Sequence, residues 1–398
     1  MNARVYDTVV VGGGPAGATA AHDLARAGAT TLLIDKPGRI KPCGGAIPPK
    51  LIEEFDIPDS LLVARAHSAR IVSPADRHVD MPISGGFVGM VDREVFDEWL
   101  RERARQAGAE RADGKVESLE KDDDGGWRVT YRPHDARRTG LTETLHARTV
   151  VGADGANSLV AKRGLPGSPR VPFVFAYHEV IASPEQEGRD FDGSRCDIYY
   201  RGDLSPDFYS WIFPHGAQTS VGTGTARQGF SLRGSVAAFR RECGLTQAET
   251  IRCEGAPIPL KPLKRWDNGD DLLVVGDAAG IVAPASGEGI YYAMSGGRYA
   301  AEAVRNRLAT GDRRALATAR KRFMRAHGKV FWILGMMQHF WYASDKRRER
   351  FVAICADPDV QYLTWEAYMH KRLVRAKPAA HMRIFFKDMA HLLGLAPS

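Results

Sequence analysis

Residues 6–35 read YDTVVVGGGPAGATAAHDLARAGATTLLID, and this stretch decides the fold. The β-branched run at 9–11 predicts a short buried strand, and residues 30–34 predict a second strand that ends at Asp35. The small residues of 16–27 predict a helix between the two strands. The stretch therefore predicts a βαβ unit.

Three glycines follow the first strand at G-x-G-x-x-G spacing. Gly12 permits the tight turn, Gly14 lets a pyrophosphate approach the backbone, and Gly17 lets the helix pack close to the sheet. The helix start offers free N–H groups to phosphates, and Asp35 is placed to accept hydrogen bonds from a ribose. The pattern predicts dinucleotide binding; the alternative is a structural glycine turn without a ligand.

The composition is that of a globular protein of two or three domains, with 398 residues of which 44% are hydrophobic. The net charge of +7 favours anionic membranes or acidic ligands as partners. We expect no membrane-spanning segment and no signal peptide, because the first strand begins almost at once. Five cysteines without a C-x-x-C pair suit a reducing cytosol and argue against structural zinc.

The loop at 36–49, KPGRIKPCGGAIPP, leaves the strand that ends at Asp35, so we expect it to lie over the cofactor. Cys43 would then stand beside a flavin ring, or it is a small buried residue in a turn. Residues 91–105 predict a helix, and Arg93 in its first turn would reach a phosphate or ribityl chain, or face solvent.

Two later strands lead into acidic turns. Residues 149–159, TVVGADGANSL, place Asp154 at the end of a strand, where ligands of open α/β sheets gather. Residues 272–289, LLVVGDAAGIVAPASGEG, place Asp277 where it would hold ribityl or ribose hydroxyls. A helix starting near Gly289 would direct its positive end at the reduced flavin.

Strand-rich residues 173–225 include FYSWIFP, in which Tyr209, Trp211 and Phe213 alternate and share one face. That face lines an apolar pocket or packs on its own core. The tail at 313–398 predicts helices that either cover the second domain or contact a membrane surface. In the second case its basic residues would meet anionic headgroups: Lys346, Arg347, Arg348 and Arg350.

The order of G-x-G-x-x-G, A-D-G and V-V-G-D-A-A-G resembles FAD-containing oxidoreductases of the p-hydroxybenzoate hydroxylase architecture. Within that group, the PCGG run and the segment FYSWIFPHGAQTSVGTG are similar to the geranylgeranyl reductase family, in particular the reductases of chlorophyll and bacteriochlorophyll synthesis. In that family a Y-x-W-x-F-P segment followed by G-x-G lines the prenyl pocket. Many relatives carry Glu where this chain has Asp35, and the shorter acid still accepts ribose hydrogen bonds.

The resemblance implies bound FAD, with NADPH or another carrier such as ferredoxin as reductant, and saturation of a geranylgeranyl chain to phytyl on geranylgeranyl diphosphate or a geranylgeranylated pigment. It implies Cys43, Tyr209 and Trp211 as catalytic residues. The residues it implies for cofactor binding are Gly12, Gly14, Ala16, Gly17, Asp35, Lys36, Cys43, Gly44, Gly45, Arg93, Asp154, Gly276, Asp277, Gly287, Gly289 and Ile290. Those implied for the substrate pocket are Tyr209, Trp211, Phe213, Pro214, Gly222 and Gly224.

The implied fold is α/β, a Rossmann-like FAD-binding domain with a sheet-rich substrate domain and a helical C-terminal region. We expect 1–60, 90–170 and 265–310 to form the first, 61–89 and 171–264 the second, and 311–398 the third. The expected location is cytoplasmic or peripheral at the inner or photosynthetic membrane.

The residues suit reduction of an unpolarised alkene, which needs a hydride and a proton. The aromatic faces of Tyr209 and Trp211 would stabilise cationic character, and the Cys43 thiol would relay the proton or tune the flavin. The chain has no second G-x-G-x-x-G, so we expect no permanent nicotinamide domain. The rival interpretations are a flavin monooxygenase or halogenase, and a prenyl-binding escort protein of the same fold.

Overall fold

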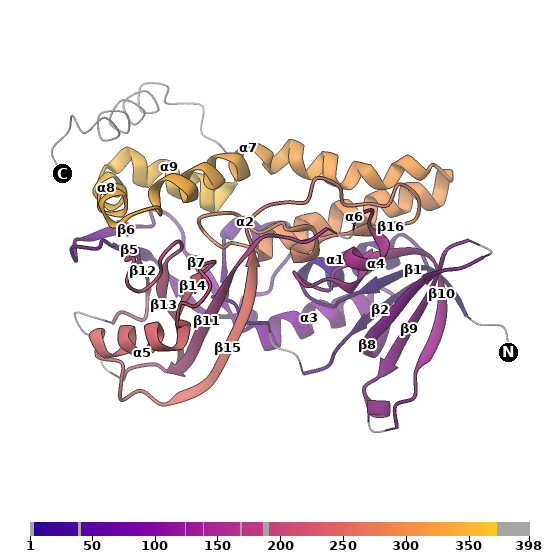
Figure 1. Ribbon diagram of the computed structural model, residues 1–398, viewed down its shortest axis with the longest axis horizontal. Coiled ribbons are helices and arrows are strands. Elements are labelled where there is room, and N and C mark those ends of the chain that lie inside the picture. Colours follow the sequence, from indigo (N-terminus) through magenta and orange to yellow (C-terminus); the bar gives the residue numbers. More distant parts are fainter. Residues whose placement is uncertain are drawn as a thin grey trace. The chain divides into compact units, whose positions relative to one another are not determined.

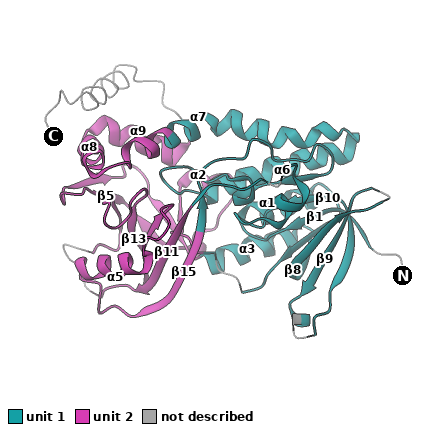
Figure 2. Ribbon diagram, viewed as in Figure 1, with its two compact units in different colours: residues 1–41, 93–173, 257–335 teal, residues 42–92, 174–256, 336–398 magenta. Residues whose placement is uncertain are grey.

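The computed structural model describes residues 4–38, 41–123, 125–137, 139–167, 169–185 and 191–371. The chain divides into two compact units, coloured separately in Figure 2. Unit 1 comprises residues 1–41, 93–173 and 257–335, and unit 2 comprises 42–92, 174–256 and 336–398. Each unit therefore collects segments that lie far apart in the sequence.

Unit 1 is built on a six-stranded sheet whose strands lie side by side in Figure 1. Its parallel part runs in the order β8, β2, β1, β10, β16, and β9 pairs antiparallel with β8 and β10. The strands are β1 (Val5–Val11), β2 (Thr31–Asp35), β8 (Glu110–Lys121), β9 (Trp127–Pro133), β10 (Glu143–Gly152) and β16 (Leu272–Val274). The valines of β1 are buried, as their β-branched run predicts.

Helices accompany this sheet. The most extensive helix–helix contact joins α1 (Pro15–Arg26) and α6 (Ile290–Thr310). The two helices approach closely because Gly297 of α6 has no side chain, and a Cβ there would overlap the carbonyl oxygen of Ala16. The other helices of unit 1 are α3 (Arg93–Gln106), η2 (Asp135–Arg137), α4 (Leu159–Gly164), η3 (Gly276–Ala279), η4 (Arg313–Leu316) and the part of α7 (Ala317–Trp341) up to residue 335.

The parallel register brings the predicted acidic and glycine turns to one edge of the sheet. β1, β2, β10 and β16 are parallel neighbours, so the residues that follow their carboxyl ends share that edge. Gly12 follows β1, Asp35 ends β2, Asp154 follows β10 and Asp277 follows β16. This convergence is the feature of the fold that creates a candidate ligand site.

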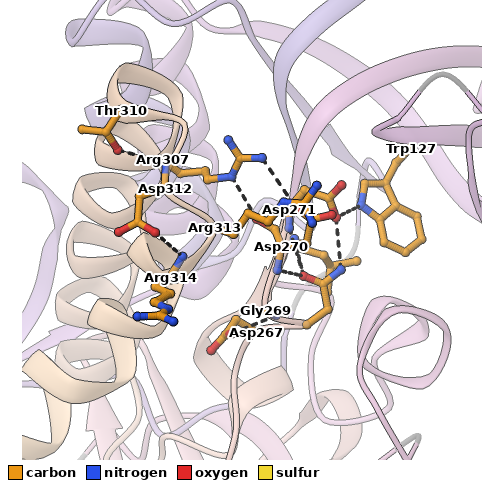
Figure 3. A network of polar contacts seen from close by, with 12 residues as sticks. Trp127, Asp267, Gly269, Asp270, Asp271, Arg307, Thr310, Asp312, Arg313 and Arg314 are labelled. Carbon is orange, nitrogen blue, oxygen red and sulfur yellow. Dashed lines mark hydrogen bonds and ion pairs between the residues drawn. The ribbon is translucent and has the colours of Figure 1, made fainter.

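A polar network fixes the start of β16 at the opposite edge (Figure 3). The buried carboxylate of Asp271 accepts a hydrogen bond from Nε1 of Trp127 at 2.8 Å. Nε of Arg307 donates to the carbonyl oxygen of Asp270 at 3.0 Å, and Arg313 forms an ion pair with the Asp270 carboxylate at 3.3 Å. Because these contacts anchor β16 at its beginning, they help to direct Asp277 at its other end.

Unit 2 contains a seven-stranded sheet in the order β15, β11, β14, β13, β12, β5, β6, and a three-stranded sheet in the order β3, β7, β4. The larger sheet consists of β5 (Ser68–Val72), β6 (His78–Pro82), β11 (Phe173–Ala182), β12 (Arg195–Tyr199), β13 (Ser210–His215), β14 (Gln218–Thr225) and β15 (Thr250–Pro259). The smaller one consists of β3 (Ala46–Ile47), β4 (Leu62–Ala66) and β7 (Val88–Val91). The fold class is confirmed: an α/β unit with a mostly parallel sheet accompanies a sheet-rich unit.

The helices of unit 2 are α2 (Pro49–Glu54), η1 (Asp59–Leu61), α5 (Leu232–Glu242), α8 (Asp345–Cys355) and α9 (Pro358–His370). α5 packs its apolar face on the larger sheet, where Val236 and Phe239 join a buried cluster with Ile212 and Val221. The unit division differs from the sequence boundaries in placing 42–60 with the sheet-rich segments and in dividing the region 311–398 between both units.

The tail is helical to residue 370, as predicted, and residues 372–398 lie outside the described residues. One expectation about its charges is wrong. Arg348, expected to meet anionic headgroups, is buried with 2% exposure. It donates a hydrogen bond to the backbone carbonyl of Tyr342 at 2.5 Å and so holds the turn before α8. No helix in the described part of the chain has the length and apolarity needed to cross a membrane.

Candidate active site

The glycine loop after β1 shows three different surroundings for its three key glycines. Gly12 has a φ of +102°, and a Cβ there would overlap the backbone of Ala153. A Cβ at Gly17 would overlap the carbonyl oxygen of Gly12. A Cβ at Gly14 would have no described heavy atom within 4 Å. Gly12 and Gly17 are thus required by the backbone, while Gly14 leaves one side of the loop open.

Two helix starts in unit 1 present positive ends. α1 begins after Gly14 and α6 begins after Gly289, and neither N-cap residue makes a side-chain capping bond. Neither helix has an acidic residue in its first turn. Since the first N–H groups of a helix carry partial positive charge, both ends suit an anionic group. Pro15 at the first turn of α1 removes one of those donors and fixes the helical backbone.

Asp35 lies beside an arginine that sequence reasoning missed. Nη1 of Arg101 donates to Asp35 Oδ2 at 3.1 Å and to the carbonyl oxygen of Gly13 at 3.3 Å. Burial raises the pKa of the Asp35 carboxyl, and the charge of Arg101 opposes this rise. Arg101 follows Arg93 by eight residues on α3, so helical spacing places both on one face, and this is the signal that would have found it.

Arg93 and Asp154 are both engaged within the protein. The guanidinium of Arg93 forms a bidentate pair with Asp97, at 2.8 and 2.7 Å, and both side chains are buried. The carboxylate of Asp154 accepts from the backbone N–H of Leu159 at 2.7 Å and from the hydroxyl of Ser158, so it caps α4. Both residues therefore shape the edge of the sheet through local contacts.

The turn after β16 brings Asp277 to Lys41. The Asp277 carboxylate is buried with 8% exposure and forms an ion pair with the ammonium of Lys41, a residue that the sequence analysis did not single out. A Cβ added at Gly276 would stand 2.8 Å from Cβ of Ala16, so this turn packs closely on α1. The remaining predicted cofactor residues of unit 1 lie around the same turns: Lys36 after β2, and Gly287, Gly289 and Ile290 at the start of α6.

In unit 2 the structure joins two motifs that lie far apart in the sequence. A Cβ at Gly44 would stand 2.8 Å from Cδ2 of Phe213. Gly45, with a φ of +68°, is tied to β7 by a hydrogen bond from Val91 N–H to its carbonyl oxygen at 3.0 Å, and an added Cβ would stand 2.5 Å from Nε2 of His215. The PCGG loop therefore packs on the aromatic strand β13.

The aromatic side chains of β13 and of Tyr209, the residue before it, share one face, as predicted. Ring centroids of Tyr209 and Trp211 are 6.0 Å apart, and those of Trp211 and Phe213 are 6.2 Å apart. The Trp211 ring covers Gly222, where a Cβ would overlap it, and Phe208 lies 3.1 Å from an added Cβ at Gly224. Pro214 is buried as well, but it alternates with Trp211 and Phe213 and so lies on the other side of β13. The glycines of β14 thus give the aromatic rings the space that they occupy.

Two titratable groups beside this face are held neutral. Burial, the Tyr200 phenol and the Cys43 thiol raise the pKa of Tyr209 far above its usual value. Burial lowers the pKa of His215, and its Nδ1 lies 2.9 Å from the carbonyl oxygen of Phe213, so Nδ1 carries the proton. The Cys43 sulfur accepts a hydrogen bond from Gly45 N–H at 3.5 Å. The aromatic face therefore offers uncharged donors and rings.

Of the predicted residues, unit 1 collects the glycine loop and the turns with Asp35, Asp154 and Asp277, and unit 2 collects Cys43, Gly44 and Gly45 with the aromatic strand. The residues of unit 1 fit a flavin dinucleotide. The open side of Gly14 would leave room for a pyrophosphate, the two positive helix ends would suit anionic groups, and Asp35 would accept hydrogen bonds from a ribose. Fold and site thus define a flavin-dependent oxidoreductase.

Comparisons with known proteins identify the family. Residues 6–188 match the family model described as pyridine nucleotide-disulphide oxidoreductase, and residues 222–390 match the one described as lycopene cyclase protein. The chain is 55% identical to geranylgeranyl diphosphate reductase of Rhodobacter capsulatus over 392 residues, covering 98% of each chain. The chain therefore belongs to the geranylgeranyl diphosphate reductase family.

Solved structures share the fold. A geranylgeranyl bacteriochlorophyll reductase-like protein from Thermoplasma acidophilum matches with a TM-score of 0.78 and 23% identity, over 95% of this chain and 99% of that one. A flavin-dependent brominase matches with a TM-score of 0.74 and 18% identity, over 97% of this chain and 100% of that one. Both structures are relatives in fold alone.

Proposed function

We propose that this protein is an FAD-dependent reductase that saturates isolated C=C bonds of a geranylgeranyl chain, giving phytyl. The observation that carries the proposal is the packing of the PCGG loop on the aromatic strand in unit 2. It supports an apolar surface for an isoprenoid chain, since Tyr209, Trp211 and Phe213 are close together and lie beside uncharged groups. The family membership supports the same substrate class.

The flavin, when bound and reduced, supplies the hydride for an alkene carbon. In unit 1 the glycine loop, Asp35 and Asp277 would hold it, with Arg101 and Lys41 fixing the two carboxylates. An ion pair to a carboxylate fixes the orientation of that carboxylate, which suits an acceptor for ribose or ribityl hydroxyls.

The residues of unit 2 would handle the substrate and the proton. As one carbon of a trisubstituted alkene takes a hydride, the other carries positive charge, and the faces of Tyr209 and Trp211 stabilise a cation. The proton is proposed to come from a side chain of this face. The candidate donors are the Cys43 thiol and the Tyr209 hydroxyl, and the thiol is near enough to Tyr209 to raise the pKa of its phenol.

The reductant is proposed to be NADPH docking transiently, and ferredoxin is the alternative. The deciding experiment is anaerobic incubation with geranylgeranyl diphosphate and with geranylgeranylated bacteriochlorophyll, each with NADPH or reduced ferredoxin. Mass spectrometry then counts the hydrogens added. We expect products heavier by two hydrogens per reduced bond; no added hydrogen on either substrate with a fully reduced flavin would contradict the proposal.

The role of Cys43 is tested separately by Cys43→Ala. If the thiol relays the proton, phytyl formation falls while the bound flavin is retained. Unchanged turnover with bound flavin removes Cys43 from the mechanism. Oxygen-dependent product formation, in turn, would favour the monooxygenase or halogenase alternative.

Peripheral contact with a membrane is proposed for α7. Trp332 and Met336 are one turn apart and 67% and 51% exposed, and Arg325 and Lys329 on the same helix are also exposed. Such a mixture of basic and large apolar side chains suits an anionic bilayer surface. Co-sedimentation with vesicles containing anionic lipid, compared between the wild type and Trp332→Ser, tests it: binding that is equal in both contradicts it.

A further inference from the structure

We propose that Ser220, His178 and Glu254 form a hydrogen-bond chain that fixes the indole of Trp211, so that they are positioning residues for the substrate face. The inference deepens the proposed function and rests on it for the role of Trp211. None of the three residues was singled out from the sequence, because they come from three different strands: β14, β11 and β15.

The register of the larger sheet of unit 2 brings the members of this hydrogen-bond chain together. Trp211 on β13, Gly222 on β14 and His178 on β11 stand in one row across the sheet. Gly222 leaves a gap in the row, since an added Cβ would overlap the Trp211 ring and stand 2.6 Å from Cβ of His178. The indole lies across this gap, and its Nε1 reaches Oγ of Ser220 at 3.0 Å.

The chain continues to a carboxylate. Oγ of Ser220 lies 2.8 Å from Nδ1 of His178, and Nε2 of His178 lies 3.0 Å from Oε2 of Glu254. Trp211, Ser220 and His178 are buried, with exposures of 6%, 2% and 4%. Water therefore has little access to the three inner groups, and each depends on its neighbour in the chain.

Counting donors and acceptors fixes both ends of the hydrogen-bond chain. An indole N–H only donates, so Ser220 Oγ accepts from Trp211. A carboxylate only accepts, so Nε2 of His178 carries a proton and donates to Glu254. Between them, Nδ1 of His178 either donates to the Ser220 hydroxyl or accepts from it, and in both cases Ser220 Oγ accepts from Trp211. The hydrogen-bond chain therefore favours one orientation of the indole.

Glu254 is anchored at the far end. Its Oε1 forms an ion pair with Nε of Arg252 at 3.1 Å, so the two carboxylate oxygens have different partners. Burial raises the pKa of Glu254, but the hydrogen bond with His178 and the charge of Arg252 outweigh burial and lower the pKa overall. The carboxylate is thus ionised at neutral pH and accepts the hydrogen bond from Nε2–H of His178.

The first test does not depend on the substrate. In the flavin-loaded protein labelled with ¹⁵N at tryptophan, Trp211→Phe assigns the Trp211 indole resonance. We expect slow solvent exchange of this N–H in the wild type and exchange at least tenfold faster in Ser220→Ala. The matched control is Ser210→Ala, a buried serine on β13 whose hydroxyl instead donates to Thr223 at 2.9 Å, and it leaves the resonance unchanged. An unchanged exchange rate in Ser220→Ala overturns the proposal.

The second test is a double-mutant cycle on turnover of geranylgeranyl diphosphate. Ser220→Ala lowers kcat/KM about fivefold, the equivalent of one hydrogen bond. In the Trp211→Phe background, which lacks the indole N–H, Ser220→Ala changes kcat/KM less than twofold. Equal losses in both backgrounds would show a merely structural role.

Glu254→Ala is a second variant, at the partly exposed end of the hydrogen-bond chain, and it replaces Ser220→Ala in the cycle should that variant not fold. The loss of kcat/KM that it causes must also vanish in the Trp211→Phe background. If the wild type reduces no prenyl substrate, the proposed function fails, while the indole exchange rates still decide whether the hydrogen-bond chain exists.

Discussion

Glycines do different work in the two units. In the loop after β1, the missing side chains of Gly12 and Gly17 make room for backbone atoms, those of Ala153 and of the loop itself. In unit 2, Gly44 and Gly222 make room for the rings of Phe213 and Trp211. Backbone atoms cannot move without breaking the sheet, whereas a ring can change its rotamer. The comparison teaches that the first set of glycines is needed for folding and the second for the shape of the aromatic face.

The largest effect is expected for Gly17→Ala. The new Cβ overlaps the carbonyl oxygen of Gly12, and α1 must move away from the sheet to relieve the contact. Overpacking in a rigid site costs about 1–3 kcal/mol or more, a large share of the stability of a typical domain. We expect little folded protein, measured by circular dichroism and thermal unfolding. A variant with wild-type Tm would break the comparison.

The second-largest effect is expected for Gly14→Ala, and it falls on flavin affinity. Its backbone, with φ of −73° and ψ of −176°, is open to alanine, and no described atom lies within 4 Å of the added Cβ. The Tm of the flavin-free protein should therefore stay unchanged, while flavin affinity falls on the order of 100-fold because the methyl group occupies the phosphate approach. Titration of flavin-free protein with FAD measures this. Retained affinity would mean that the pyrophosphate lies elsewhere.

A smaller effect is expected for Gly222→Ala in unit 2. The Trp211 ring must rotate away and His178, whose Cβ stands 2.6 Å from the added Cβ, must shift with its strand, at a cost of about 1–3 kcal/mol in unfolding free energy, while flavin binding is retained. Gly224→Ala is the matched comparison, since Phe208 is 3.1 Å from its added Cβ and has only to shift slightly. Denaturant unfolding of both variants checks the order. Gly222→Ala that unfolds like the wild type would contradict the assignment of this glycine to the ring.

The smallest effect is expected for Arg101→Met in unit 1. Asp35 loses its cationic partner, so its carboxylate is less well held for a ribose, and we expect FAD affinity to fall about tenfold, or about 1.4 kcal/mol. Arg105→Met on the same helix is the control, because Arg105 is exposed and forms its ion pair with Glu102, away from Asp35. Equal affinities in the two variants would separate Asp35 from the cofactor.

Much of unit 1 was predictable because its signals are local. The strand that ends at Val11, the glycine spacing and the helix that follows lie within one stretch, and the strands before Asp154 and Asp277 carry the same apolar run. The face shared by Tyr209, Trp211 and Phe213 also follows from alternation along one strand. The buried position of Arg348 did not follow, because a run of basic residues has no period that marks which one turns inward.

By itself the sequence determined the α/β class, the edge of the sheet that carries the ligand residues, and the aromatic strand, since each depends on neighbours in the chain. Only the tertiary structure decided that Arg101 reaches Asp35, that Gly44 meets Phe213, and that Glu254 holds His178. These pairs are many residues apart, and strand register and helix packing bring them together. Local periodicity says which face a side chain takes, but only the folded chain says what it meets there.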